Sequence, residues 1–112
     1  MKIAIPVADG KVCMHFGHSQ SFSLIEIDEA TKGIIGSSSI IPPPHEPGVL
    51  PRWLHEKGAD VIITGGMGMR AQQFFQEYGI KVVVGAPAEI PEKIAEQYIN
   101  GTLVTSGNIC DH

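Results

Sequence analysis

The sequence has few cysteines, few basic residues and no long apolar segment. Only two cysteines occur among the 112 residues, whereas a conventional iron–sulfur centre takes about four cysteine thiolates. Eight Lys and Arg residues against twelve Asp and Glu residues give a net charge of −4. The chain therefore lacks the clustered positive charge that neutralises nucleic-acid phosphates. No apolar run approaches the roughly 20 residues that span a membrane. We expect a protein that binds neither nucleic acid nor membrane.

The length and the composition indicate a single domain over residues 1–112. Apolar residues make up 43% of the chain and charged residues 18%, a balance typical of a globular protein with a real core. The opening residues MKIAIPVADG contain one lysine and a short apolar run, which favours a first strand over a secretory signal. We expect a cytoplasmic protein, in which two cysteines serve as thiols or ligands rather than as a structural disulfide.

The apolar pattern predicts an α/β fold. Alternating or continuous apolar stretches predict strands, and helical spacing predicts helices. The strands are expected over residues 2–7, 21–28, 34–41, 60–64 and 80–85, and the helices over residues 49–57, 69–78 and 88–100. A short turn joins the second and third strands into an antiparallel hairpin, whereas helices separate the later strands and favour parallel pairing. The expected result is a three-layer domain with a five-stranded mixed sheet.

Three loops are expected at one edge of this sheet. Residues 8–19, 65–69 and 85–87 each follow a strand of the parallel part, and functional loops of such sheets gather at the carboxyl ends of the strands. The segments CMHFGH and GGMGM should therefore face each other. We expect them to form one shallow cavity.

Two Cys-x-His pairs provide four candidate metal ligands: Cys13 and His15 near the start, Cys110 and His112 at the end. Thiolate and imidazole together suit zinc, copper(I) and iron–sulfur units. For the first pair, the alternative is a partly buried thiol beside a structural imidazole. A shared site would require residues 102–112, which we expect to form a mobile tail, to fold back. Without metal, this segment has too few large apolar side chains to stay docked beyond Val104.

The segment TGGMGMRA predicts a glycine loop that opens a helix and supplies candidate cofactor-binding residues: Gly65, Gly66, Gly68 and Arg70. It fits a dinucleotide fingerprint, but no acidic residue ends the next strand, so that interpretation is poor. A helix N-terminus with free N–H groups, together with the charge of Arg70, would hold an anionic sulfide or oxo cluster. Met67 and Met69 could add thioethers, although core or lid packing is the preferred interpretation for Met69.

The segments KIAIPV, FGHSQSFSLIEID, GADVIITGGMGMRA and NICDH resemble the dinitrogenase iron–molybdenum cofactor family over nearly the whole chain. The resemblance implies a ribonuclease H-like fold, with sheet order 3-2-1-4-5 and flanking helices. It also implies binding and delivery of an iron- or molybdenum-containing metal–sulfur cluster or its precursor, with a cluster donor or acceptor protein as partner. The FGH motif contributes His18 as a cofactor-binding candidate, with a structural role as the alternative. We expect a monomer or weak homodimer.

Catalysis is not expected. Asp9, Asp28 and Asp60 lie at different ends of the predicted sheet and do not converge on a metal pair as nuclease carboxylates do. Two other hypotheses stay open: a small zinc-stabilised interaction module, and a redox-sensing pair formed by Cys13 and Cys110.

Overall fold

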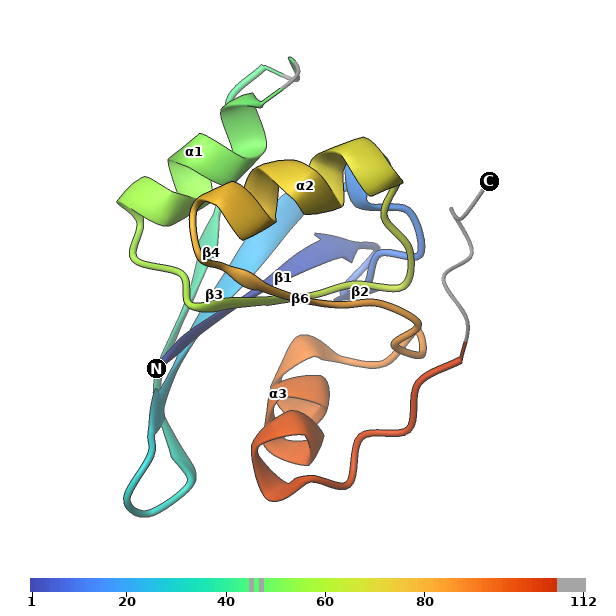
Figure 1. Cartoon of the computed structure of the whole chain (residues 1–112). Helices are drawn as coiled ribbons and strands as arrows, with labels where there is room; N and C mark the ends of the chain where they lie inside the picture. The colour runs from blue at the N-terminus through green and yellow to red at the C-terminus, as the bar shows by residue number, and fades with distance from the viewer. Residues whose placement is uncertain (45, 47, 107–112) are drawn as a thin grey trace.

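The computed structural model describes residues 1–44, 46 and 48–106, and for His18 it describes the backbone alone. A mixed sheet lies between two layers of helices (Figure 1). Its longer strands are β1 (Lys2–Ala8), β3 (Ser21–Asp28), β4 (Gly33–Ile40), β5 (Val61–Ile63) and β6 (Lys81–Val83). They lie in the order β4-β3-β1-β5-β6, which is the order that the family resemblance implied. The predicted α/β class and mixed sheet are confirmed.

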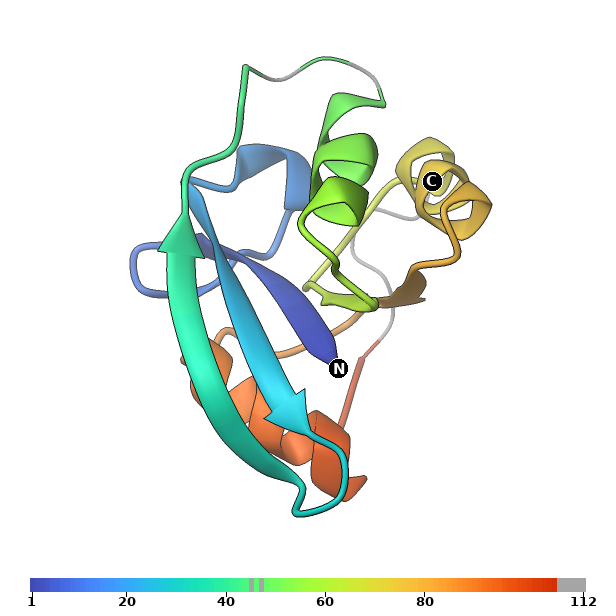
Figure 2. The same ribbon diagram turned by 90° about the vertical axis from the view of Figure 1, so that its left-hand side faces the viewer.

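The strand directions follow the connections. β1 pairs antiparallel with β3, and β3 pairs antiparallel with β4. β5 lies parallel to both β1 and β6. Helices α1 (Val49–Glu56) and α2 (Met69–Glu77) cover one face of the sheet, and α3 (Pro91–Asn100) covers the other (Figures 1 and 2). The parallel strands therefore end together, on the side where the loops that follow them can meet.

The described part of the sheet has six strands, so the prediction of five strands was wrong. The additional strand, β2 (Lys11–Val12), pairs antiparallel with the end of β1. Asp9 and Gly10 form the turn between them, with φ angles of 55° and 78°. An Asp-Gly pair with two positive φ angles is the preferred connection of a two-residue β-hairpin. The prediction of one loop over residues 8–19 was therefore wrong for Lys11 and Val12.

Each face of the sheet has its own apolar core. Ile3 and Ile5 point toward α3 and pack in one cluster with Ile94, whereas Ala4, between them, belongs to the cluster under α1 and α2 with Phe75. This division follows from the period of two in a strand, which sends successive side chains to opposite faces. None of the helices within the described residues is long and apolar enough to cross a membrane.

Candidate functional site

The loops after β1, β5 and β6 meet at one end of the sheet, as the predicted topology required. The Gly65 N–H donates to the Cys13 carbonyl (3.1 Å), and the Gly85 N–H donates to the Gly65 carbonyl (2.9 Å). The Phe16 N–H donates to the Gly66 carbonyl (2.9 Å). Main-chain hydrogen bonds thus connect three segments that are far apart in the sequence.

The glycine loop can approach the first loop because Gly65 has no side chain. A Cβ atom at this position would lie 2.7 Å from Met14 Cα and 3.1 Å from the Met14 carbonyl oxygen. Thr64, which is fully buried, places its hydroxyl 3.3 Å from the Cys13 carbonyl and 3.4 Å from the Gly66 carbonyl. Gly65 and Gly66 are themselves buried, so their position favours a role in joining the loops rather than in contacting a ligand.

Cys13 is buried at the centre of this junction, with 5% of its surface exposed. Its S–H donates to the His15 carbonyl at 2.8 Å, so the thiol is directed into its own loop. His15 is exposed. Within residues 1–44, 46 and 48–106, no three His, Cys, Asp or Glu side chains are grouped to hold a metal ion. Cys110 and His112 lie outside the described residues, so the four-ligand set stays a prediction.

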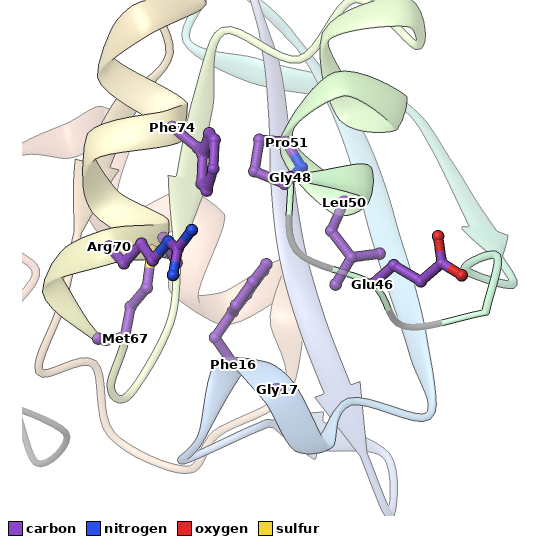
Figure 3. Close-up of a pocket in the computed structure, with 11 residues that line it drawn as sticks. Phe16, Gly17, Glu46, Gly48, Leu50, Pro51, Met67, Arg70 and Phe74 are labelled. Carbon is purple, nitrogen blue, oxygen red and sulfur yellow. The ribbon is translucent and has the colours of Figure 1, made fainter.

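A cavity of about 280 Å³ opens beside the loop junction, between α1, α2 and the FGH turn (Figure 3). Its walls are mainly apolar and include Phe16, Leu50 and Phe74. Gly68 and Arg70, which the sequence singled out as cofactor-binding candidates, line it as well. In Figure 3 the Arg70 guanidinium and the rings of Phe16 and Phe74 point into the space between the helices, whereas the Glu46 carboxylate points away.

Phe16 is a site residue that the sequence analysis quoted as part of the FGH motif but gave no role. It opens the short 3-10 helix η1 (Phe16–His18) and is 6% exposed. Its ring packs edge-on against Phe22 and Phe75, with centroid distances of 6.0 and 5.5 Å. The turn is thereby anchored in the core below the cavity. The signal was available in the sequence, since Phe16 is the largest apolar residue of residues 8–19 and the only phenylalanine, tyrosine or tryptophan among them.

The helix N-terminus predicted at this site is present. Gly68 is the N-cap of α2 and is exposed, and Arg70 follows in the first turn. The first N–H groups of a helix have no partner within the helix and give its N-terminus a partial positive charge. The cavity therefore has an electropositive rim on the α2 side and an apolar interior. The side chain of His18 lies outside the described part of the chain, so its assignment stays a prediction.

The two methionines of the glycine loop lie in different environments. Met67 is 1% exposed and belongs to the core cluster under α1 and α2, whereas Met69 is 55% exposed at the start of α2. Core or lid packing had been the preferred interpretation for Met69, and its exposure shows that it is not a core residue. The reason is helical geometry, because position 69 begins the helix on its solvent side while position 67 precedes it in the loop.

The chain after α3 returns to the loop junction. The Ser106 N–H donates to the Gly85 carbonyl at 2.8 Å. Residues 107–112 lie outside the described residues, so the expectation of a mobile tail that apolar packing docks no further than Val104 stays a prediction. Val104 is 81% exposed, so within the described residues a main-chain hydrogen bond, and not burial of Val104, holds Ser106.

The sequence model of the family described as "Dinitrogenase iron-molybdenum cofactor" matches residues 1–101. The chain belongs to this family. Among solved structures, that of PH0822 is similar at 31% identity, with a TM-score of 0.86 and 95% of each chain covered. The apo form of the orange protein from Desulfovibrio gigas is 25% identical, with a TM-score of 0.71, covering 96% of this chain and 93% of that one.

MJ0327 from Methanocaldococcus jannaschii shares the fold at 20% identity, with a TM-score of 0.75 and 96% of each chain covered. No functionally curated protein matches the sequence significantly. The match of the family model confirms the membership that the sequence resemblance indicated.

Proposed function

We propose that this protein binds and carries an anionic metal–sulfur cluster, containing iron or molybdenum, or a precursor of such a cluster, and that it catalyses no reaction. The observation that carries the proposal is the cavity between α1 and α2, with Arg70 directed into it and the exposed N-terminus of α2 at its rim. Family membership supports a role connected with the iron–molybdenum cofactor.

The physical chemistry of the cavity suits a soft anion. Arg70 provides a full positive charge and a planar set of donors, and the start of α2 adds free N–H groups. Arg70 is exposed, so solvent screens part of its attraction for an anion. The apolar walls formed by Phe16, Leu50 and Phe74 shield one side of a bound cluster from water. They also offer favourable contact to polarisable sulfides. Such a site holds its cargo without a complete set of covalent ligands, which suits a carrier that must release it.

The Cys-x-His pairs remain candidate anchors for the cluster. Cys13 would have to give up its hydrogen bond to the His15 carbonyl and release its thiol proton to solvent before its sulfur could bind metal as a thiolate. A hydrogen bond of this kind contributes about 0.5–1.5 kcal/mol, which a metal–thiolate bond exceeds. Recruitment of Cys13, and of Cys110 with His112 from the C-terminal segment, would then follow initial binding at Arg70. The zinc alternative has no support from the described residues or from the comparisons.

We further propose that the protein exchanges its cluster with a donor or acceptor protein, as a monomer or weak homodimer, and contacts neither nucleic acid nor membrane. Gly68 lines the cavity and is exposed, and the exposed Met69 follows it at the start of α2. A partner could therefore approach the cargo along the start of α2.

Binding of tetrathiomolybdate, a coloured anionic metal sulfide, tests the proposal under anaerobic conditions. The wild-type protein should bind it, and Arg70→Gln should weaken the affinity by about 10- to 150-fold, since a hydrogen bond to a charged group contributes roughly 1.5–3 kcal/mol. The affinity of Arg70→Lys should lie between those of the wild type and Arg70→Gln, because lysine keeps the charge but not the planar set of donors of arginine. Arg52→Gln is the matched control, because Arg52 is exposed on α1 and does not line the cavity. Equal affinity for the wild type and Arg70→Gln would contradict the proposal.

A further inference from the structure

We propose that Gly85 and Ser106 form a latch that holds residues 101–106 against the loop junction and slows exchange of the cargo. This inference rests on the proposed function, since it concerns the same site. Gly85 and Ser106 are positioning residues, because neither lines the cavity.

The latch is a close main-chain contact that requires glycine. Gly85 follows β6 and has a φ of +84°, in the left-handed region. Ser106 donates its N–H to the Gly85 carbonyl at 2.8 Å and places its hydroxyl 3.4 Å from the same oxygen. A Cβ atom on Gly85 would lie 1.9 Å from the Ser106 carbonyl oxygen and 2.7 Å from its carbonyl carbon. No other residue at position 85 leaves room for Ser106.

The segment between α3 and the latch has little else to hold it. The N–H groups of Thr102 and Leu103 donate to the Gln97 carbonyl at the end of α3, and Leu103 packs partly buried against the α3-side core. Beyond this point Val104 is 81% exposed. Figure 1 shows the segment, in red, returning alongside α3 toward the turn after β6. One hydrogen bond of this kind shifts an equilibrium by a factor of roughly 2–12, so the latch can open and close readily.

The latch is connected to the cavity through successive main-chain hydrogen bonds. Ser106 donates to Gly85, Gly85 donates to Gly65, and Gly65 donates to Cys13. Consecutive bonds share a residue, first Gly85 and then Gly65, so a shift of one loop is passed along the backbone to the next. The Cys13 loop leads directly to Phe16, which lines the cavity and is bonded to the glycine loop. A closed latch should therefore stiffen the loops that enclose the cargo, and an open latch should loosen them.

The test compares Gly85→Ala with Gly79→Ala in the full chain. Gly79 has a φ of +73°, and a Cβ atom added there would meet no neighbour within 4 Å. Gly85 has a comparable φ, but a Cβ atom added there would collide with Ser106. Both variants carry the backbone strain of a left-handed alanine, so their difference reports the latch. Ser106→Pro is a second variant, which removes the N–H donor at an exposed position and leaves the core unchanged.

Two measurements are made on each protein: hydrogen exchange of the Gly65 amide, and the rate at which bound tetrathiomolybdate is released. In Gly85→Ala and Ser106→Pro, the Gly65 amide should exchange, and tetrathiomolybdate should be released, about 2- to 10-fold faster than in the wild type, as expected for loss of one hydrogen bond. In Gly79→Ala both rates should equal those of the wild type. Equal release by Gly85→Ala, Ser106→Pro and the wild type would overturn the latch while leaving the proposed function intact. Failure of the wild type to bind tetrathiomolybdate would overturn both.

Discussion

Replacing Gly65 by alanine should separate the two loops that build the site. The added Cβ atom would lie 2.7 Å from Met14 Cα and 3.1 Å from both the Met14 carbonyl oxygen and its sulfur. The sulfur can move away, but the backbone atoms can yield only if one loop shifts. Overpacking of this kind costs about 1–3 kcal/mol. Weakening the hydrogen bond from Gly65 to the Cys13 carbonyl adds roughly 0.5–1.5 kcal/mol. We therefore expect the free energy of unfolding to fall by about 1.5–4.5 kcal/mol.

Urea unfolding measures this loss. With a slope near 2 kcal/mol per molar urea, typical of a small domain, the midpoint should fall by about 1–2 M. Gly68→Ala is the matched control in the same loop, because a Cβ on Gly68 has no neighbour within 4 Å. Its cost should stay within about 1 kcal/mol, the difference between glycine and alanine at a helix N-cap. A Gly65→Ala variant that unfolds at the wild-type midpoint would refute the close approach of the two loops.

Two smaller changes probe the junction and the start of α3. Thr64→Val removes the hydroxyl that donates to the Cys13 and Gly66 carbonyls. The free energy of unfolding measured in urea should fall by about 0.5–1.5 kcal/mol. A variant more stable than the wild type would argue against these hydrogen bonds. The pKa of Glu89 is lowered by its hydrogen bond from Lys93 and by the charge of that lysine, so Lys93→Met should raise it toward its ordinary value in an NMR titration. A carboxyl group whose pKa is lowered by folding stabilises the folded state at pH values above its pKa in the unfolded chain. This contribution should disappear as the pH falls through the pKa of Glu89 in the folded protein. An unchanged Glu89 pKa in Lys93→Met would contradict the pairing.

The strands and helices were predictable because periodicity and helix stops are local signals. Residues 21–28 alternate clearly, and the structure places β3 at the same bounds. The convergence of the loops followed from topology alone, since the parallel strands had to end together. The short β2 was also predictable from Asp9-Gly10, whose preference for a tight hairpin turn was overlooked.

Other features depend on contacts that no local pattern contains. The segments CMHFGH and GGMGM were expected to face each other across one cavity, yet in the structure the Cys13 thiol is buried at the junction while Arg70 faces the cavity. The cavity also depends on how α1 crosses near α2 and on how deeply Phe16 inserts between them. These are properties of packing between segments distant in the sequence. The bond from Ser106 to Gly85 was not foreseen for the same reason.

NMR mapping of the tetrathiomolybdate site on isotopically labelled protein tests the central proposal most directly. The largest shifts should fall on the amides of Gly17, Gly68 and Arg70, which line the cavity between α1 and α2. They should saturate with the affinity measured by absorbance and weaken in Arg70→Gln. Shifts centred on the opposite part of the sheet, such as the groove of Lys2, Glu26 and Ser38, would contradict the account.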